Sequence, residues 1–226
     1  MSDVAYSLLY FHYRYSEKLG RPVQAELYKL LGYNPTTNRF RDGLMVDTDE
    51  KIVEGLIAYL ERNGVESGDA TKFAHDNFFR YNASSHITVP QDNPQELFKL
   101  LREYGVKIAV CTSDSEPGNN EMISSLGLTG LIDYSLCGDN ELMKPKPFSG
   151  NINVVCDRLG VKPEDTMMVG DSLRDMEMGR GANIRATIGV LTGVCEEEDL
   201  KGKADYIVPS VKHVLQIAVP KCTTVL

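Results

Sequence analysis

Three polar clusters in the sequence carry residue types that could bind a phosphate group and a divalent cation. The first contains Thr112 and Ser113, the second contains Lys144 in a Lys-Pro-Lys-Pro run, and the third contains Asp171 and Asp175. Carboxylates are preferred ligands of Mg²⁺, whereas hydroxyl groups and a fixed ammonium bind phosphoryl oxygens. The combination therefore predicts a phosphate site with Mg²⁺ as its cofactor.

Each cluster also has a purely structural explanation. A Thr-Ser pair after a strand is most often a turn or a helix cap, and a lysine between prolines usually lies in a solvated loop. Gly170-Asp171-Ser172 could likewise cap the following helix, and the two acids could be surface charges. All three clusters occur in one chain and in this order, which favours the chemical interpretation.

Short apolar runs and amphipathic stretches alternate after residue 88, and these elements would position the clusters. The expected strands are 106–111, 134–137, 166–169, 186–190 and 206–207, and the expected helices are 93–104, 119–126, 149–159 and 175–181. Such alternation is typical of the α/β class, with a Rossmann-like parallel sheet covered by helices. Ligands of such sheets bind outside the carboxyl ends of the strands, where each cluster is expected to lie.

The region before residue 87 differs and predicts a small all-helical domain. Helices are expected at 8–19, 23–31, 49–62 and 68–81, and the first and third have apolar residues on one face. No strand is expected before residue 85, although the short apolar run at 7–11 is the one alternative that could form a strand. The sequence therefore predicts two domains, a helical one at 1–86 and an α/β one at 87–226.

Composition excludes several classes of partner. A net charge of −8 argues against nucleic acid, which requires a basic face, whereas local positive groups could still bind a small phosphorylated metabolite. No apolar run approaches the roughly 18 residues that span a membrane, and the N-terminus has no signal-peptide pattern. Five cysteines without a Cys-x-x-Cys pair indicate free thiols, so the expected location is the cytoplasm. No pattern predicts an oligomeric state.

The α/β region resembles the core of the haloacid dehalogenase superfamily, in its phosphoglycolate-phosphatase-like branch. IAVCTSDS, MKPKPFSGN and MMVGDSLRDMEMG are similar to the second, third and fourth motifs of that family. The resemblance implies a Mg²⁺-dependent hydrolase of small phosphomonoesters in which Thr112, with Ser113 beside it, binds the phosphoryl group. It further implies that Lys144 stabilises the phosphoryl charge, that Asp171 is the metal ligand and that Asp175 is the supporting acid.

The same resemblance covers the remaining parts of the chain. Lys146 falls at the variable position of the third motif. The helical region at 1–86 resembles the cap domain that covers the active site and selects the substrate in this family.

One motif of the family has no counterpart in the sequence. The first motif is Asp-x-Asp at the end of an apolar strand, where one acid attacks phosphorus and the other is the general acid and base. Asp47-Thr48-Asp49 is the only Asp-x-Asp and is expected in a loop before a helix, and Asp3 is expected to lead into the first helix. We therefore identify no nucleophile. We also expect the sheet to lack its central strand, between 106–111 and 166–169.

Three hypotheses about function follow from this departure. The chain could be a shortened hydrolase that needs a segment before Met1, a non-catalytic pseudophosphatase that binds a phosphorylated ligand or regulates a full-length relative, or a scaffold without a ligand. The scaffold hypothesis is weaker, because all three polar clusters are present together.

The missing strand would cost about 1–3 kcal/mol for each buried backbone group left unpaired. That cost is severe against a total stability of roughly 5–15 kcal/mol.

Overall fold

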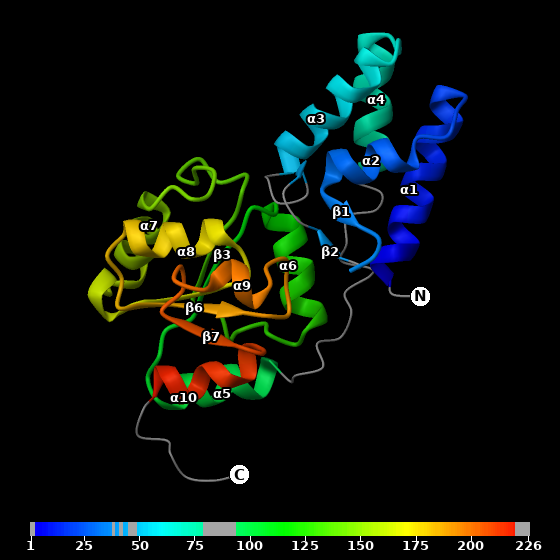
Figure 1. The fold of residues 1–226 in the computed structure, drawn as a ribbon. Helices are drawn as coiled ribbons and strands as arrows, with labels where there is room; N and C mark the ends of the chain where they lie inside the picture. Colours follow the sequence, from blue (N-terminus) through cyan, green and yellow to red (C-terminus); the bar gives the residue numbers. More distant parts are fainter. Residues whose placement is uncertain (1–2, 38, 41–42, 45–48, 79–93, 220–226) are drawn as a thin grey trace. The chain divides into compact units, whose positions relative to one another are not determined.

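A computed structural model of the chain describes residues 3–37, 39–40, 43–44, 49–78 and 94–219 (Figure 1). The chain divides into two compact units, Met1–Thr88 and Val89–Leu226. In the described part of the chain, no helix is both long and apolar enough to cross a membrane.

The first unit is mainly helical. Its described helices are α1 (Asp3–Leu19), α2 (Gln24–Leu31), α3 (Asp49–Arg62) and α4 (Ser67–Phe78). A two-residue antiparallel ribbon, β1 (Tyr33–Asn34) with β2 (Arg39–Phe40), departs from the prediction of an all-helical unit. The reason is local, because the Asn34 side-chain oxygen accepts the backbone N–H groups of Thr36 at 2.9 Å and Thr37 at 3.4 Å. This Asx turn reverses the chain and brings the two short strands together.

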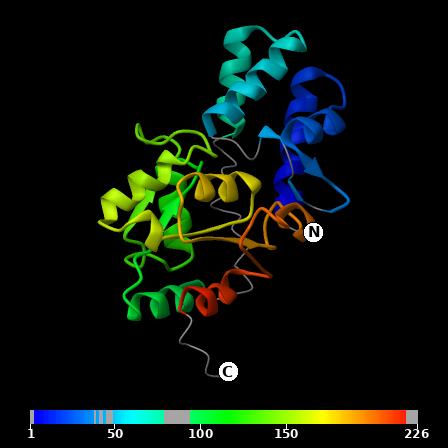
Figure 2. The same cartoon turned by 60° about the vertical axis from the view of Figure 1, so that its left-hand side comes forward.

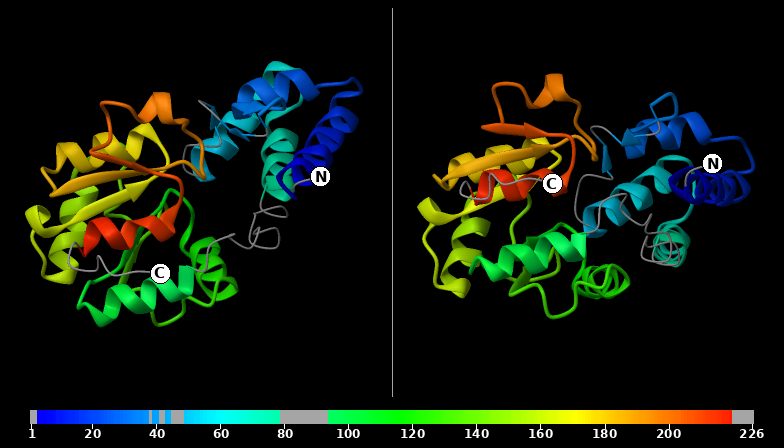
Figure 3. Two further views of the ribbon diagram at one scale, coloured as in Figure 1. Left: turned by 60° about the horizontal axis from the view of Figure 1, so that its bottom comes forward. Right: turned by 90° about the horizontal axis from the view of Figure 1, so that it is seen from below.

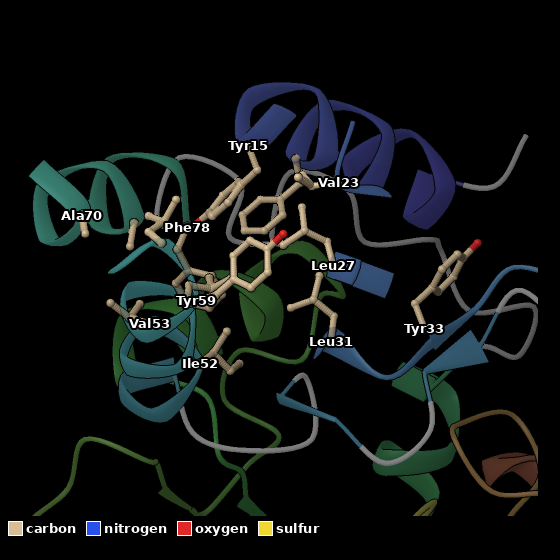
Figure 4. Close-up of a cluster of buried hydrophobic side chains, with 14 residues drawn as sticks. Tyr15, Val23, Leu27, Leu31, Tyr33, Ile52, Val53, Tyr59, Ala70 and Phe78 are labelled. Atoms are coloured by element: carbon tan, nitrogen blue, oxygen red, sulfur yellow. The ribbon is translucent and has the colours of Figure 1, made fainter. Parts of the chain in front are cut away.

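Apolar side chains from the helices of the first unit form one core (Figure 4). Tyr15, Leu56 and Leu60 are completely buried in it, and the Tyr15 ring lies 4.6 Å from that of Phe11 and 5.1 Å from that of Phe73. Burial raises the pKa of the Tyr15 hydroxyl, which has no hydrogen-bond partner among the described residues. The packing of these rings links α1 to α4.

A surface network connects α2 to α3. The two carboxylate oxygens of Glu26 accept bonds from Arg21 at 2.6 and 2.9 Å, and Oε2 also accepts the Tyr59 hydroxyl at 2.6 Å. The bonds from Arg21 and then from Tyr59 lower the pKa of Glu26 to about 2. Burial, followed by the bond to Glu26, raises the pKa of Tyr59 to about 12. The network therefore favours the ionised carboxylate and the neutral phenol.

We expect Glu26→Gln to remove part of the acid sensitivity of the first unit. The pKa of Glu26 is about 2 when folded against an ordinary 4.5, so its stabilising contribution is complete above pH 4.5 and is lost as the pH falls towards 2. Urea unfolding followed by circular dichroism should give a shallower fall in unfolding free energy for the variant over this range. The effect is modest because the network is solvent-exposed. Glu54→Gln, on the exposed side of α3, is the control, and equal slopes for wild type and Glu26→Gln would contradict the expectation.

The second unit has a sheet layer between two layers of helices, as the α/β prediction required. The sheet layer contains β3 (Ala109–Cys111), β4 (Tyr134–Leu136), β5 (Met167–Gly170), β6 (Ala186–Val190) and β7 (Tyr206–Val208). One face is covered by α7 (Gly150–Leu159) and α8 (Leu173–Gly181), and the other by α5 (Pro94–Glu103) and α10 (Val214–Ala218) (Figures 1 and 2). Helices α5 and α10 lie side by side, as Figure 3 shows from below. The remaining helices are α6 (Glu116–Ser125), α9 (Glu197–Leu200) and the 3-10 turns Pro163–Asp165 and Val211–His213.

The parallel sheet of the second unit is in two separate pieces. Strand β3 pairs with β4, and β5, β6 and β7 pair in that order, all in parallel. Within the described residues, no strand pairs with the other edge of β3 or of β5. All five residues of β6 are buried, whereas β5 is only partly buried and Val169 is 36% exposed. Among the described residues, β3 and β5 therefore belong to different pieces of the sheet.

Strand β3 begins later than the predicted 106–111. The backbone N–H of Ile108 is donated to the Asp133 carboxylate at 2.8 Å, and the N–H of Asp133 is donated to the Ile108 carbonyl at 2.7 Å. Asp133 also accepts a bond from Arg102 at 2.8 Å. A side chain thus takes the place of a neighbouring strand at Ile108, so regular pairing starts at Ala109.

Candidate functional site

The three polar clusters lie in the loops that follow β3, β4 and β5. Thr112 comes directly after β3, the Lys-Pro-Lys-Pro run follows β4, and Asp171 comes directly after β5. Burial raises the pKa of the Cys111 thiol at the end of β3, while the charge of Lys146 lowers it and that of Asp175 raises it. These electrostatic effects indicate that the carboxyl end of β3 lies near the second and third clusters.

A buried ion pair joins the second cluster to the third. The ammonium of Lys146 lies 2.8 Å from Asp175 Oδ1, and the two side chains are 15% and 5% exposed. Burial alone would lower the pKa of Lys146, but the charge of Asp175 and its hydrogen bond outweigh burial and leave the pKa raised. The ammonium is therefore held charged at the carboxyl ends of the strands.

Asp175 also caps the helix that follows it in the third cluster. Its Oδ2 accepts the Ser172 hydroxyl at 2.7 Å and the Ser172 backbone N–H at 3.2 Å, and the Asp175 N–H is donated to Ser172 Oγ at 3.2 Å. This reciprocal pattern is a capping box at the start of α8. Any side chain at Gly170 would overlap the Asp175 carboxylate. The third cluster thus caps α8 through Ser172, as its structural explanation proposed, but Asp175 is buried and paired with Lys146, so it is not a surface charge.

Asp171 is anchored by the loop that follows β6. Its Oδ2 accepts the Val194 N–H at 2.9 Å, and its backbone carbonyl accepts the Cys195 N–H at 3.0 Å. A side chain at Gly193 would overlap the carboxylate, so glycine is needed there for the loop to approach. The described residues form no hydrogen bond with the other carboxylate oxygen, Oδ1.

The residues around Asp171 could bind Mg²⁺ only if water and a phosphate group supplied most of its ligands. In the described residues, no three histidines, cysteines or acids form a group that could hold a metal ion. Asp175 uses one carboxylate oxygen for Lys146 and the other for Ser172, which leaves Asp171 Oδ1. Mg²⁺ typically keeps several waters and binds through one or two carboxylates plus the phosphate of a substrate. The residues therefore fit an ion held by one carboxylate, water and phosphate.

The structure brings Lys146, and not Lys144, to the ion pair. Lys144 has an exposed side chain, and its backbone N–H and carbonyl bond to the side chain of Asn151. The family resemblance implied that Lys144 stabilises the phosphoryl charge and that Lys146 occupies the variable position. A lysine followed by proline occurs twice in this run, so the pattern alone does not distinguish the two positions.

Thr112 and Ser113 lie at the carboxyl end of β3, as predicted, and both are half-buried. The Thr112 hydroxyl donates to Asp114 Oδ2 at 3.0 Å and accepts the Asp114 N–H at 3.1 Å. The Ser113 carbonyl lies against Gly138, where a side chain would overlap it. The Thr112 hydroxyl thus forms a local turn, and no direct hydrogen bond joins Thr112 to Lys146 or Asp171.

Two of the acids considered for the missing first motif are the first residues of helices. Asp3 is the first residue of α1 and Asp49 is the first residue of α3. Asp47 and Thr48 lie outside the described residues.

Comparisons with known proteins point to one family. The family model described as haloacid dehalogenase-like hydrolase matches residues 66–189. The chain is 29% identical over 125 residues to N-acylneuraminate-9-phosphatase of Rattus norvegicus, which covers 54% of the chain and 49% of that protein. It is 28% identical over 171 residues to sugar-phosphatase AraL of Bacillus subtilis, which covers 73% of the chain and 60% of that protein. The match thus spans about half the length of these curated relatives.

Two solved structures share the fold. A predicted phosphoglycolate phosphatase from Haemophilus somnus superposes with a TM-score of 0.67 at 19% identity, covering 95% of this chain and 90% of that one. A β-phosphoglucomutase from Clostridium difficile superposes with a TM-score of 0.64 at 17% identity, covering 99% and 95%. At these identities the likeness concerns the fold alone.

Proposed function

The chain belongs to the haloacid dehalogenase-like hydrolase family, and we propose that it contains the phosphate- and metal-binding part of a phosphomonoester hydrolase. The observation that carries the proposal is the buried Lys146–Asp175 pair, with Asp171 acting on the same ammonium. The fixed ammonium of Lys146 can bind a phosphate group, and the carboxylate of Asp171, with Oδ1 left for a ligand, can bind a divalent cation. The curated relatives are phosphatases by name, and two act on sugars or N-acylneuraminate, so the proposed substrate is a small phosphorylated metabolite.

The proposed roles follow the contacts of each side chain. Lys146 binds the phosphoryl oxygens, which is the role expected for Lys144 from the family resemblance, and Asp175 orients Lys146. Thr112 and Ser113 contribute hydroxyl groups at the end of β3. Asp171 would hold Mg²⁺, which when bound offsets phosphoryl charge.

We assign the attacking carboxylate of the proposed mechanism to none of the described residues. We propose that it is carried on a strand that pairs with the open edges of β3 and β5, so that hydrolysis needs this strand in addition to the residues above. The alternative is a pseudophosphatase, which would bind phosphate at the same site without turnover.

Two further features belong to this proposal. The first unit is proposed to be the cap domain that selects the substrate. The cytoplasm is the proposed location, and free thiols at Cys111, Cys137, Cys156 and Cys195 support a reducing compartment.

The proposal is tested by phosphate binding and turnover measured on the same preparation. Inorganic phosphate with Mg²⁺ is expected to bind to the purified chain, measured by calorimetry, and Asp171→Asn should weaken binding about 10–100-fold, as loss of metal-site groups does. Lys162→Met is the control, because the Lys162 side chain is 72% exposed and pairs with the equally exposed Glu164. Absence of phosphate binding by the wild type would refute the proposal.

Turnover of p-nitrophenyl phosphate separates the two forms of the proposal. Binding without turnover supports a chain that lacks its nucleophile, and activity restored by an added apolar peptide ending in Asp-x-Asp would favour the hydrolase over the pseudophosphatase. Turnover by the chain alone that Asp171→Asn abolishes would show that the nucleophile lies within the 226 residues.

A further inference from the structure

Asn151 makes an unusual pair of bonds in the second unit. It lies in the first turn of α7 and its side chain is completely buried. Its Oδ1 accepts the Lys144 backbone N–H at 3.0 Å, and its Nδ2 donates to the Lys144 carbonyl at 2.8 Å. Nδ2 also contacts Met178 Sδ at 3.7 Å. One amide side chain thus satisfies both backbone groups of a single loop residue.

We propose that Asn151 is a positioning residue that holds the loop so that the Lys146 ammonium reaches Asp175. Lys146 is two residues after the clamped Lys144, and the same loop is fixed on the other side by the Phe148 N–H, which is donated to the Pro145 carbonyl at 3.1 Å. A lysine side chain has a flexible four-carbon stem and loses rotamer entropy when its ammonium is fixed in one place. A backbone fixed on both sides of Lys146 limits where the ammonium can lie and favours its contact with Asp175.

A second buried asparagine in the same unit provides a matched comparison. Asn119 in α6 is also completely buried, but neither end of its side-chain amide has a hydrogen-bond partner among the described residues. Both residues are helical, fully buried and identical in type. They differ in that Asn151 bonds to the loop that carries Lys146.

The test measures the accessibility of Lys146 in Asn151→Leu and Asn119→Leu. Folded protein is labelled briefly with acetic anhydride, and mass spectrometry compares the labelling rate of Lys146 with that of exposed Lys162 in the same molecules. We expect Asn151→Leu to raise the relative rate at Lys146 about tenfold or more, as expected for loss of one charge-assisted hydrogen bond. Asn119→Leu should leave the ratio unchanged.

Two results would overturn the inference. One is an unchanged ratio in folded Asn151→Leu, and the other is an equal rise in both variants, which would indicate general loosening. If Asn151→Leu does not fold, Asn151→Asp replaces it. The carboxylate keeps an acceptor for the Lys144 N–H but loses the donor to the Lys144 carbonyl. The same rise in the relative labelling rate of Lys146 is expected.

The positioning role of Asn151 rests on the proposed function only in one respect, namely that a displaced Lys146 would also weaken phosphate binding. The labelling ratio reports the position of Lys146 whether or not phosphate binds. If wild type fails to bind inorganic phosphate but Asn151→Leu still exposes Lys146, the proposed function fails and the positioning role stands. If wild type binds phosphate but the ratio does not change, the positioning role alone fails.

Discussion

Asp175→Ala should destabilise the second unit by about 3–5 kcal/mol, because it leaves the Lys146 ammonium buried without its partner. The same change removes the capping box of α8, which contributes about 1 kcal/mol by itself. Against a total stability of roughly 5–15 kcal/mol, this loss is enough to populate the unfolded state. Urea unfolding at neutral pH measures it as a lower midpoint with an unchanged slope.

Two further variants separate the ion pair from the helix cap. Asp175→Asn keeps an oxygen that can accept the Ser172 hydroxyl but removes the charge, so its loss should be smaller than that of Asp175→Ala. Adding Lys146→Met to Asp175→Asn removes both charges and should recover most of the remaining loss, since a buried pair replaced together costs little. If Asp175→Ala is equally destabilising with and without Lys146→Met, the ion pair contributes nothing and the cap explains the whole effect.

The positions of the site loops could be predicted from sequence because local patterns determine them. Strand β6 was predicted as 186–190 and is Ala186–Val190, a run whose five residues are all buried. The third cluster also has a local signature, since Ser172 and Asp175 are three residues apart and form the capping box at the end of a strand. Parallel strands place their carboxyl ends at one edge, so the clusters were expected to converge.

The details of the site could not be predicted, because they depend on contacts between distant residues. Asp171 accepts the N–H of Val194, 23 residues later, and no pattern around either residue indicates this bond. The choice between Lys144 and Lys146 depends on Asn151, which bonds to the backbone of the first and leaves the second to reach Asp175. The sequence signal for Asn151 is only a polar residue on the buried face of a helix.

The separation of β3 and β5 among the described residues has an energetic consequence that can be tested with two valines. Val190 lies in β6 with 6% of its surface exposed, and Val169 lies in β5 with 36% exposed. Val190→Ala removes two buried side-chain carbon atoms and leaves a cavity, so we expect the unfolding free energy to fall by about 2–3 kcal/mol. Val169→Ala should cost less than about 1 kcal/mol, because the Val169 side chain is already partly exposed to solvent. Urea unfolding followed by circular dichroism compares the two.

The comparison is informative because the two variants make the same chemical change in neighbouring strands. Strand β6 has β5 on one side and β7 on the other, whereas β5 pairs only with β6 among the described residues. Equal losses would mean that Val169 is covered in solution, so that another strand occupies the edge of β5. In that case, a loss that depends on protein concentration would indicate a strand from a second molecule, because association stabilises by mass action. A loss independent of concentration would indicate that the covering strand comes from the same chain, and β5 would not be an open edge.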